Sequence, residues 1–343
     1  MKNKTFNLVI AILSAVALIG YVFSVEKPAG VFHALFSMIP GWLTMGLVLI
    51  LAYWFLEGYG LYLLCKKLYP DTSLKSIITV AVIGQYFNCI TPFASGGQPI
   101  QAYYMTTHSK IPIGSAATAL LSKFIVYQGV LTVYSIFVLI FKYSFFMEQV
   151  TGFAMLALIG FIVNIGVFLL LISVILFPKA MRRIVYGLID LLAKPHWLKN
   201  PEGKKESTDR ELQRFYENWS FLMKNKMVLL RVSMVTVLQL TAYLAIPYTI
   251  YRGFGLHETT LFTMIAAQAF VMMISSFVPL PGAMGAAEGS FYFFFSLFFP
   301  ASNINVSLLC WRFFTFYLPI LVGMVIVFGI DHRKKKMQPV QAN

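Results

Sequence analysis

The sequence predicts an all-α polytopic membrane protein, and three observations support that prediction. The 343 residues are 59% hydrophobic and only 12% charged, whereas soluble domains carry about 25% charged residues. Apolar runs of 18 or more residues recur along the whole chain, and each can cross a hydrocarbon layer about 30 Å thick. The net charge of +14 is concentrated between those runs, as the positive-inside rule expects of a multi-pass protein of the cell (cytoplasmic) membrane.

Six of the apolar runs have the length of complete membrane spans. The first begins after two lysines, as a signal peptide does, but its apolar part is long and no small-x-small cleavage site follows it. We therefore interpret it as a retained helix. The six predicted spans cover about residues 6–24, 42–64, 117–141, 152–177, 228–251 and 304–329.

Two further apolar stretches, 77–106 and 260–299, are interrupted near their middle by proline and glycine. Proline removes a backbone donor, and glycine disfavours a helix interior. Because several of the remaining limbs are too short to span, we predict two re-entrant hairpins, which need protein or a water-filled cavity around them. The residues at the breaks are Pro92, Gly96, Gly97 and Pro99 in the first stretch and Pro279, Pro281, Gly282 and Gly285 in the second.

The distribution of basic residues predicts the topology. If each hairpin returns to the side from which it enters, the segments on the N-terminal side of the membrane hold 21 Lys and Arg, and those on the other side hold three. The N- and C-termini are therefore predicted to be cytoplasmic. The chain then reads as one transmembrane domain, with a first half at about 1–177, a basic cytoplasmic loop at 178–227 and a second half at about 228–330.

The two halves share a pattern. Lys123 follows Pro92 by 31 residues, and Arg312 follows Pro279 by 33 residues, each within an apolar, aromatic-rich span. The charge count makes the first hairpin enter from inside and the second from outside. This is an inverted-topology repeat, an arrangement common in transporters whose site lies near the middle of the membrane.

Four ionisable residues in apolar segments are candidates for binding a charged head group. They are Glu57, Lys123, Glu288 and Arg312. A charge at the bilayer centre costs about 2.5–3.5 kcal/mol on insertion scales, so such residues face the interior and are paired. Two structural alternatives remain open: a simple ion pair between these residues, and a helix-capping role for Glu288.

The Gly96–Gly97 pair followed by Pro99 is typical of a helix start. Free amides at such a start attract anions, and a lipid phosphate is the natural anion in a membrane. The alternative is that the same amides bind a neighbouring side chain.

The basic loop 178–227 has apolar residues at helical spacing between Ala180 and Leu192. This pattern predicts an amphipathic helix on anionic lipid, or else an ordinary connector. Other chemistry lacks a sequence signal. There is no Walker-type motif, the five histidines and three cysteines have no metal-ligand spacing, and nothing indicates a metal, a cofactor or nucleic-acid binding by this chain alone.

Two stretches, Thr91–Tyr103 and Pro279–Gly289, resemble the signature segments of the lysylphosphatidylglycerol synthase/flippase membrane-region family (MprF-like, UPF0104). The second contains the more specific pattern Pro-Gly-x-x-Gly-x-x-Glu-Gly. The resemblance implies that Glu288 is the family glutamate and that Arg312 is a basic position on the following helix. The chain departs from the family around Lys123, where many members also carry acidic residues.

The resemblance implies a flippase-like lipid translocator for an aminoacylated phospholipid, such as lysylphosphatidylglycerol, with no catalytic residues and no soluble acyltransferase domain. A phosphatidylglycerol lysyltransferase that needs a separate soluble synthase is the first alternative. A non-catalytic envelope scaffold is the second. The expected partners are the membrane and a phospholipid substrate, and a homo-oligomer remains open.

Overall fold

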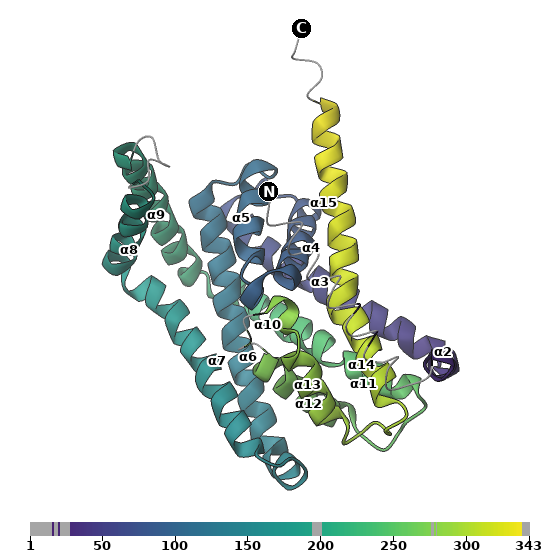
Figure 1. Cartoon of the computed structure of the whole chain (residues 1–343). Helices are drawn as coiled ribbons and strands as arrows, with labels where there is room; N and C mark the ends of the chain where they lie inside the picture. Colours follow the sequence, from purple (N-terminus) through teal and green to yellow (C-terminus); the bar gives the residue numbers. More distant parts are fainter. Residues whose placement is uncertain are drawn as a thin grey trace.

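The computed structural model describes residues 16, 20, 28–193, 201–275, 278 and 280–337, and the regular elements in them are all helical. Five segments are long and apolar enough to cross a membrane (Figure 1). They match five of the six predicted spans, while the predicted span 6–24 lies outside the described residues apart from positions 16 and 20. The chain is therefore an all-helical, multi-pass membrane protein. The five segments are Pro40–Leu68 (α3), Ile113–Gln149 (α6), Phe153–Leu176 (α7), Lys226–Gly253 and Ile304–Ile330.

Two of these five segments are composite. Lys226–Leu244 (α10) and Ile246–Gly253 (α11) meet just before Pro247, which has no N–H to continue the helix. Ile304–Arg312 (α14) and Leu318–Met337 (α15) are joined by a π-helical turn at Phe313–Tyr317 (η3). Pro319 removes a helical donor at this turn. Such π turns are frequent at functional sites, and this one directly follows Arg312.

The helix interruptions lie where proline and glycine predict them. In the first stretch, Leu74–Ile90 (α4) leads through a short turn at Pro92–Ala94 (η1) into Gly97–Thr107 (α5), which packs back on α4. In the second stretch, Leu261–Ser275 (α12) and Ala286–Phe295 (α13) pack together on either side of the turn Pro281–Ala283 (η2). Pro279 lies outside the described residues. A short helix, Pro28–Ser37 (α2), precedes α3 and contacts α14.

The two turns contact each other, so the tips of the hairpins meet. They are alike at one position, because Ala94 and Ala283 both have a left-handed φ, at 50° and 51°, although the second turn also has a left-handed φ at Gly282. This equivalence pairs Pro92 with Pro281 rather than with Pro279. Arg312 follows Pro281 by 31 residues, the same spacing that separates Lys123 from Pro92.

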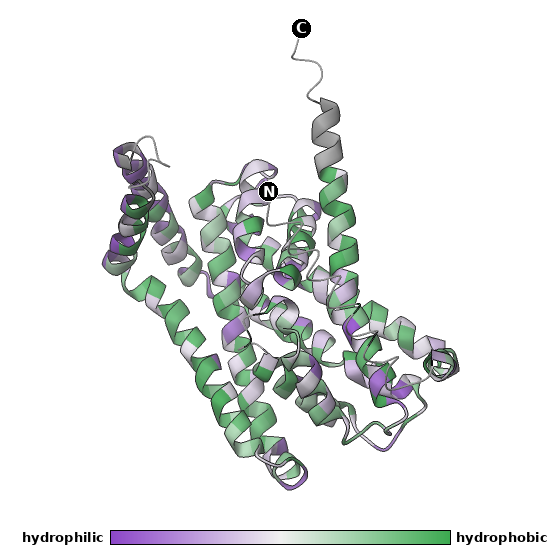
Figure 2. Ribbon diagram, viewed as in Figure 1, coloured by the Kyte–Doolittle hydropathy of each residue, from purple (hydrophilic) through white to green (hydrophobic). Residues whose placement is uncertain are grey.

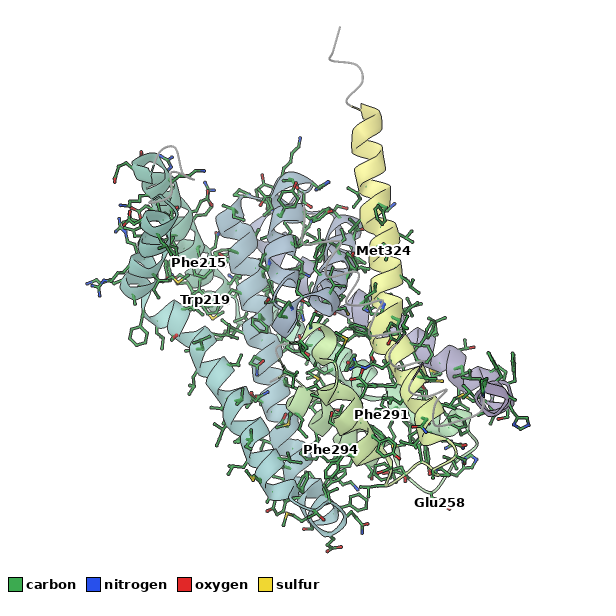
Figure 3. The ribbon with its side chains drawn as sticks, viewed as in Figure 1. Phe215, Trp219, Glu258, Phe291, Phe294 and Met324 are labelled. Carbon is green, nitrogen blue, oxygen red and sulfur yellow. The ribbon has the colours of Figure 1, made fainter. Side chains whose placement is uncertain are left out.

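An aromatic core joins the second hairpin to α6 and α7. The rings of Phe146, Phe153, Phe270 and Phe294 are packed with centroids 4.8 to 6.4 Å apart. Phe291 and Phe294 extend from α13 into this side of the bundle (Figure 3). The outer faces of α7 and α15 are also apolar, with exposed leucine, valine and phenylalanine (Figure 2), as expected where helices contact lipid.

The basic loop forms a helical hairpin that is markedly more hydrophilic than the bundle (Figure 2). Pro178–Ala193 (α8) contains the helix predicted over 180–192 and exposes Ile184, Leu188 and Leu191. Its partner, Pro201–Lys224 (α9), packs against α8, α6 and α10. Two ionic contacts join α8 to α9, one of Asp209 with Arg182 and one between Lys205 and Asp190 at 2.8 Å. Contact of α8 with lipid stays a prediction.

Helix α9 is attached to the start of α6 by hydrogen bonds. The Gly114 N–H donates to Glu211 Oε2 at 2.7 Å, so a carboxylate 97 residues further along the chain caps α6. The Thr118 hydroxyl donates to the Phe215 carbonyl at 3.2 Å, and Asn218 donates to Ser115 at 3.0 Å. The loop is therefore part of the packed structure, and Phe215 lies between the two helices (Figure 3).

Candidate functional site

The four predicted head-group residues form two separate ion pairs. Lys123 Nζ lies 3.2 Å from Glu57 Oε2, and Arg312 Nη2 lies 2.7 Å from Glu288 Oε1. Both basic side chains are buried, at 5% and 4% exposure, and both acids are more open, at 16% and 22%. Both ion pairs that the structural alternative expected are therefore formed. Ionisable residues that are paired inside a membrane protein in this way commonly mark a substrate or ion path.

The first ion pair is closed into a triangle by Gln239. Lys123 donates to Gln239 Oε1 at 2.7 Å, and Gln239 Nε2 donates to Glu57 Oε2 at 2.5 Å. The three side chains come from α6, α10 and α3. A Cβ at Gly60 would lie 2.8 Å from Lys123 Cε, so this glycine leaves room for the lysine chain. Lys123 is therefore bonded to both neighbours.

Gln239 was not among the predicted site residues, although it is fully buried. The sequence search covered ionisable groups in apolar segments, and a glutamine is uncharged. Its position near the middle of the predicted span 228–251 was the available signal, because polar side chains in such segments are placed to hydrogen bond.

The second ion pair holds the tip of the second hairpin. Arg312 Nη1 donates to the Gly282 carbonyl at 3.0 Å, and the Gly285 N–H donates to Glu288 Oε2 at 2.7 Å. Glu288 therefore both caps α13 and pairs with Arg312. Gly282 and Gly285 have φ of 60° and 83°, a region that favours glycine. A Cβ at Gly282 would also lie 2.1 Å from Phe316.

The first tip is held by uncharged side chains. The Gly96 N–H donates to Thr91 Oγ1 at 2.9 Å, and the Gly97 N–H donates to Asn88 Oδ1 at 3.0 Å. Of the two interpretations of these amides, the neighbouring side chain is the correct one. Pro99 lies in the first turn of α5, where its missing N–H costs nothing.

Two cavities adjoin at the tips. The Glu57–Lys123 pair lines a cavity of about 390 Å³, together with α5 and α7. Arg312 and Gly282 line a second cavity of about 280 Å³. Glu288, Pro92, Gly96, Gly97, Pro99, Pro281 and Gly285 line neither of these two cavities. The residues that line both are Tyr53, Gln85, Asn88, Ala94, Tyr127 and Met272.

The larger cavity has an unusually polar wall for the interior of an apolar bundle. Amide side chains line it from α4, α5, α6 and α7: Gln85, Asn88, Gln98, Gln101, Gln128 and Asn164. Asn164 also accepts a hydrogen bond at 2.6 Å from the Thr132 hydroxyl, which links α7 to α6. Such a wall can replace the hydration of a polar group that enters from water.

Metal chemistry has no support in the described part of the chain. No group of three or more His, Cys, Asp or Glu residues lies close enough there to hold a metal ion. Cys65, Cys89 and Cys310 are free thiols. The polar centres of the bundle are therefore the two ion pairs and the amides around them.

Comparison with known proteins finds relatives that share most of the length of this chain. Two curated relatives, both described as a UPF0104 membrane protein, come from Archaeoglobus fulgidus and Methanothermobacter thermautotrophicus. The first is 25% identical over 288 residues, which cover 83% of this chain and 85% of the relative. The second is 26% identical over 306 residues, 86% of each. Residues 8–323 match the family described as "Lysylphosphatidylglycerol synthase TM region", and the chain belongs to that family.

Proposed function

We propose that this protein translocates a lipid with a charged head group, of which an aminoacylated phospholipid such as lysylphosphatidylglycerol is the leading candidate, between the leaflets of the cell membrane. One observation supports this most directly: two adjoining cavities, each with a buried ion pair in its wall or at its edge, lie where two broken helices meet inside an apolar bundle. Polar backbone and charges at that depth are tolerated where they serve a substrate path.

The proposed path carries the head group only. Cavities of about 390 and 280 Å³ suit a small polar group and are too small for acyl chains. The acyl chains would stay in lipid along the apolar outer faces of the bundle. Only the head group then loses water, and the amide-lined wall compensates for that loss.

Ion-pair exchange is the proposed means of binding. A head-group phosphate would take the place of Glu288 beside Arg312, and a lysyl ammonium would take the place of a basic partner beside Glu57 or Glu288. When the phosphate pairs with Arg312 and an ammonium of the same head group pairs with Glu288, both charges of that ion pair keep a partner. Lys123 would hold the phosphate in the same way if the head group enters the larger cavity.

The two hairpins would give this site access to both leaflets. Their turns each contain a left-handed alanine, contact each other and precede Lys123 and Arg312 by the same number of residues. An inverted repeat with cytoplasmic termini would make one hairpin re-enter from each face, so that small movements of either tip open the site alternately.

Leaflet exchange of labelled lipid in proteoliposomes tests the proposal. Wild-type protein is expected to accelerate the exchange, and Glu288→Gln and Arg312→Gln are each expected to slow it at least tenfold, since each leaves a charge unpaired. Arg231→Gln is the matched control, because Arg231 is exposed on α10 and lines neither cavity. Unchanged exchange in both site variants would remove these residues from the mechanism.

The transferase alternative is favoured by the word "synthase" in the family description. Incubating the purified protein with lysyl-tRNA and phosphatidylglycerol decides it. We expect no lysylphosphatidylglycerol from this chain, and product formation would replace the translocator proposal with an enzymatic one.

A further inference from the structure

Three residues that line the smaller cavity carry buried hydrogen-bond donors that have no acceptor in the described part of the chain. Trp54, Trp311 and Arg312 line it, and their side chains are 2 to 4% exposed. Within the described residues, the two indole Nε1–H groups and Arg312 Nε have no hydrogen-bond partner. Buried donors are almost always paired in folded proteins, so three unpaired donors in one cavity wall need an explanation.

The same wall contains one unpaired acceptor. Gln268 is 1% exposed, and within the described residues its Oε1 receives no hydrogen bond. The cavity therefore lacks acceptors for three N–H groups and a donor for one oxygen. A ligand that supplies several acceptor oxygens and one nearby hydroxyl or ammonium would satisfy all four groups.

The contrast with the larger cavity indicates which of the two holds an anion. Lys123 is already bonded to Glu57 and Gln239. Arg312 has a free Nε, and its guanidinium lies 5.1 Å from the ring of Trp311 and 5.3 Å from that of Phe316. Arg312 is also paired with Glu288 and bonded to the Gly282 carbonyl, but its Nε–H has no acceptor among the described residues and remains available to an anion that displaces Glu288.

We propose that the smaller cavity is a phosphate subsite, in which the indole N–H groups of Trp54 and Trp311 and the guanidinium of Arg312 bind the oxygens of a phosphate mono- or diester. This inference rests on the proposed function for the origin of the phosphate in a lipid head group, and it assigns the phosphate to Arg312 rather than to Lys123. Gln268 then accepts a hydrogen bond from the hydroxyl or ammonium beside the phosphate.

Binding at this subsite requires the cavity wall to open slightly. The donor nitrogens are covered by neighbouring protein atoms. The wall includes the tip residues Gly282 and Ala283, and Arg312 holds that tip through the Gly282 carbonyl. A phosphate that engages Arg312 competes with this contact and with Glu288, so occupancy and movement of the second tip are coupled.

Indole N–H resonances test the proposal in the wild-type protein. The full chain is labelled with ¹⁵N-tryptophan and studied in maltoside micelles, which contain no phosphate; it has five tryptophans. The probes are inorganic phosphate, dihexanoyl phosphatidylglycerol and dihexanoylglycerol, which has no phosphate. We expect the Trp54 and Trp311 signals to move with a phosphate probe, because the N–H groups gain a charged acceptor.

The probes separate the possible sources. Shifts with the phospholipid alone, or with both phosphate probes, assign a lipid head group, and shifts with inorganic phosphate alone assign free phosphate. Equal shifts with dihexanoylglycerol, or none at either tryptophan with any probe, overturn the subsite.

Matched variants measure the contribution of each donor. Trp54→Phe and Trp311→Phe keep an aromatic ring but remove the N–H, and each is expected to weaken phosphate-probe affinity about tenfold. Trp219→Phe is the control, since Trp219 lies on α9, away from the cavity (Figure 3). Equal affinity in all three variants would contradict the proposal.

Leaflet exchange distinguishes this inference from the proposed function. If the wild-type protein exchanges lipid between leaflets but loss of the indole N–H groups does not change phosphate binding, the subsite is wrong and the translocator proposal stands. If phosphate binding depends on the indole N–H groups but the wild-type protein does not exchange lipid between leaflets, the subsite stands and the translocator proposal is wrong.

Discussion

The two hairpins each have a left-handed alanine in the tip but are stabilised by different chemistry. The first tip is fixed by Asn88 and Thr91, uncharged residues at the end of its own first limb. The second is fixed by Glu288 and by Arg312, which belongs to the helix after the hairpin. The tips thus form at matching positions of the two hairpins, whereas the response of each tip to a charged ligand follows from the side chains that hold it. Of the two tips, the second is the one held by an ion pair, and a charged ligand can displace a member of that pair.

The largest expected effect is that of Arg312→Gln. It leaves Glu288 without its cation and removes the bond to the Gly282 carbonyl, so we expect a loss of about 3–5 kcal/mol in the free energy of unfolding. Thermal or denaturant unfolding in detergent measures it. The double variant Arg312→Gln/Glu288→Gln should recover part of the loss. A destabilisation no greater than that of Arg231→Gln would mean that the charge pair does not hold the second tip.

The second largest effect is expected for Gly282→Ala. The residue has φ of 60°, and the new Cβ would lie 2.1 Å from Phe316. Left-handed strain and overpacking together should cost about 2–4 kcal/mol. Gly289→Ala is the control, because that glycine lies within α13 with nothing within 4 Å of a new Cβ. Equal unfolding midpoints for the two variants would show that the tip tolerates another backbone conformation.

A smaller effect is expected at the first tip. Thr91→Val keeps the shape of the side chain but removes the acceptor of the Gly96 N–H, at a cost of about 1 kcal/mol. Thr91→Ser keeps the hydroxyl and should stay close to wild type. The comparison is sharpened by salt, because unfolding of Thr91→Val should respond to salt as the wild type does. A strong salt dependence confined to this variant would contradict the view that hydrogen bonds to uncharged side chains hold the first tip.

The smallest effect is expected for the helical hairpin α8–α9, which serves as a baseline. A hydrogen bond from Tyr186 and the neighbouring Arg182 lower the pKa of Asp209. The contribution of this contact is therefore present above the ordinary carboxyl range and is lost as pH falls through the lowered pKa. Asp209→Asn should raise hydrogen exchange of α8 at pH 7 and leave α13 unchanged, since exposed pairs contribute little. Increased hydrogen exchange in α13 would show that the contact of Asp209 with Arg182 also stabilises the second tip.

The sequence predicted the positions of both helix breaks, because proline and glycine act locally on the backbone. Five of the six spans followed from apolar length. The pairing of Glu57 with Lys123 did not follow, since the two are 66 residues apart and meet only through the packing of α3 against α6. Gln239 and the two indoles were missed for a related reason: they are uncharged, and their importance is visible only when the groups around them are known.

The Glu211 cap on α6 has a consequence for genetic experiments on the basic loop. Removing the loop would take away the group that satisfies the Gly114 amide and the helix that covers the start of α6. A phenotype after such a deletion would report damage to the helix that carries Lys123 and not the loss of a docking platform. Point changes on the outer side of α8, such as Ile184→Ser, are the informative way to ask whether the loop recruits anything.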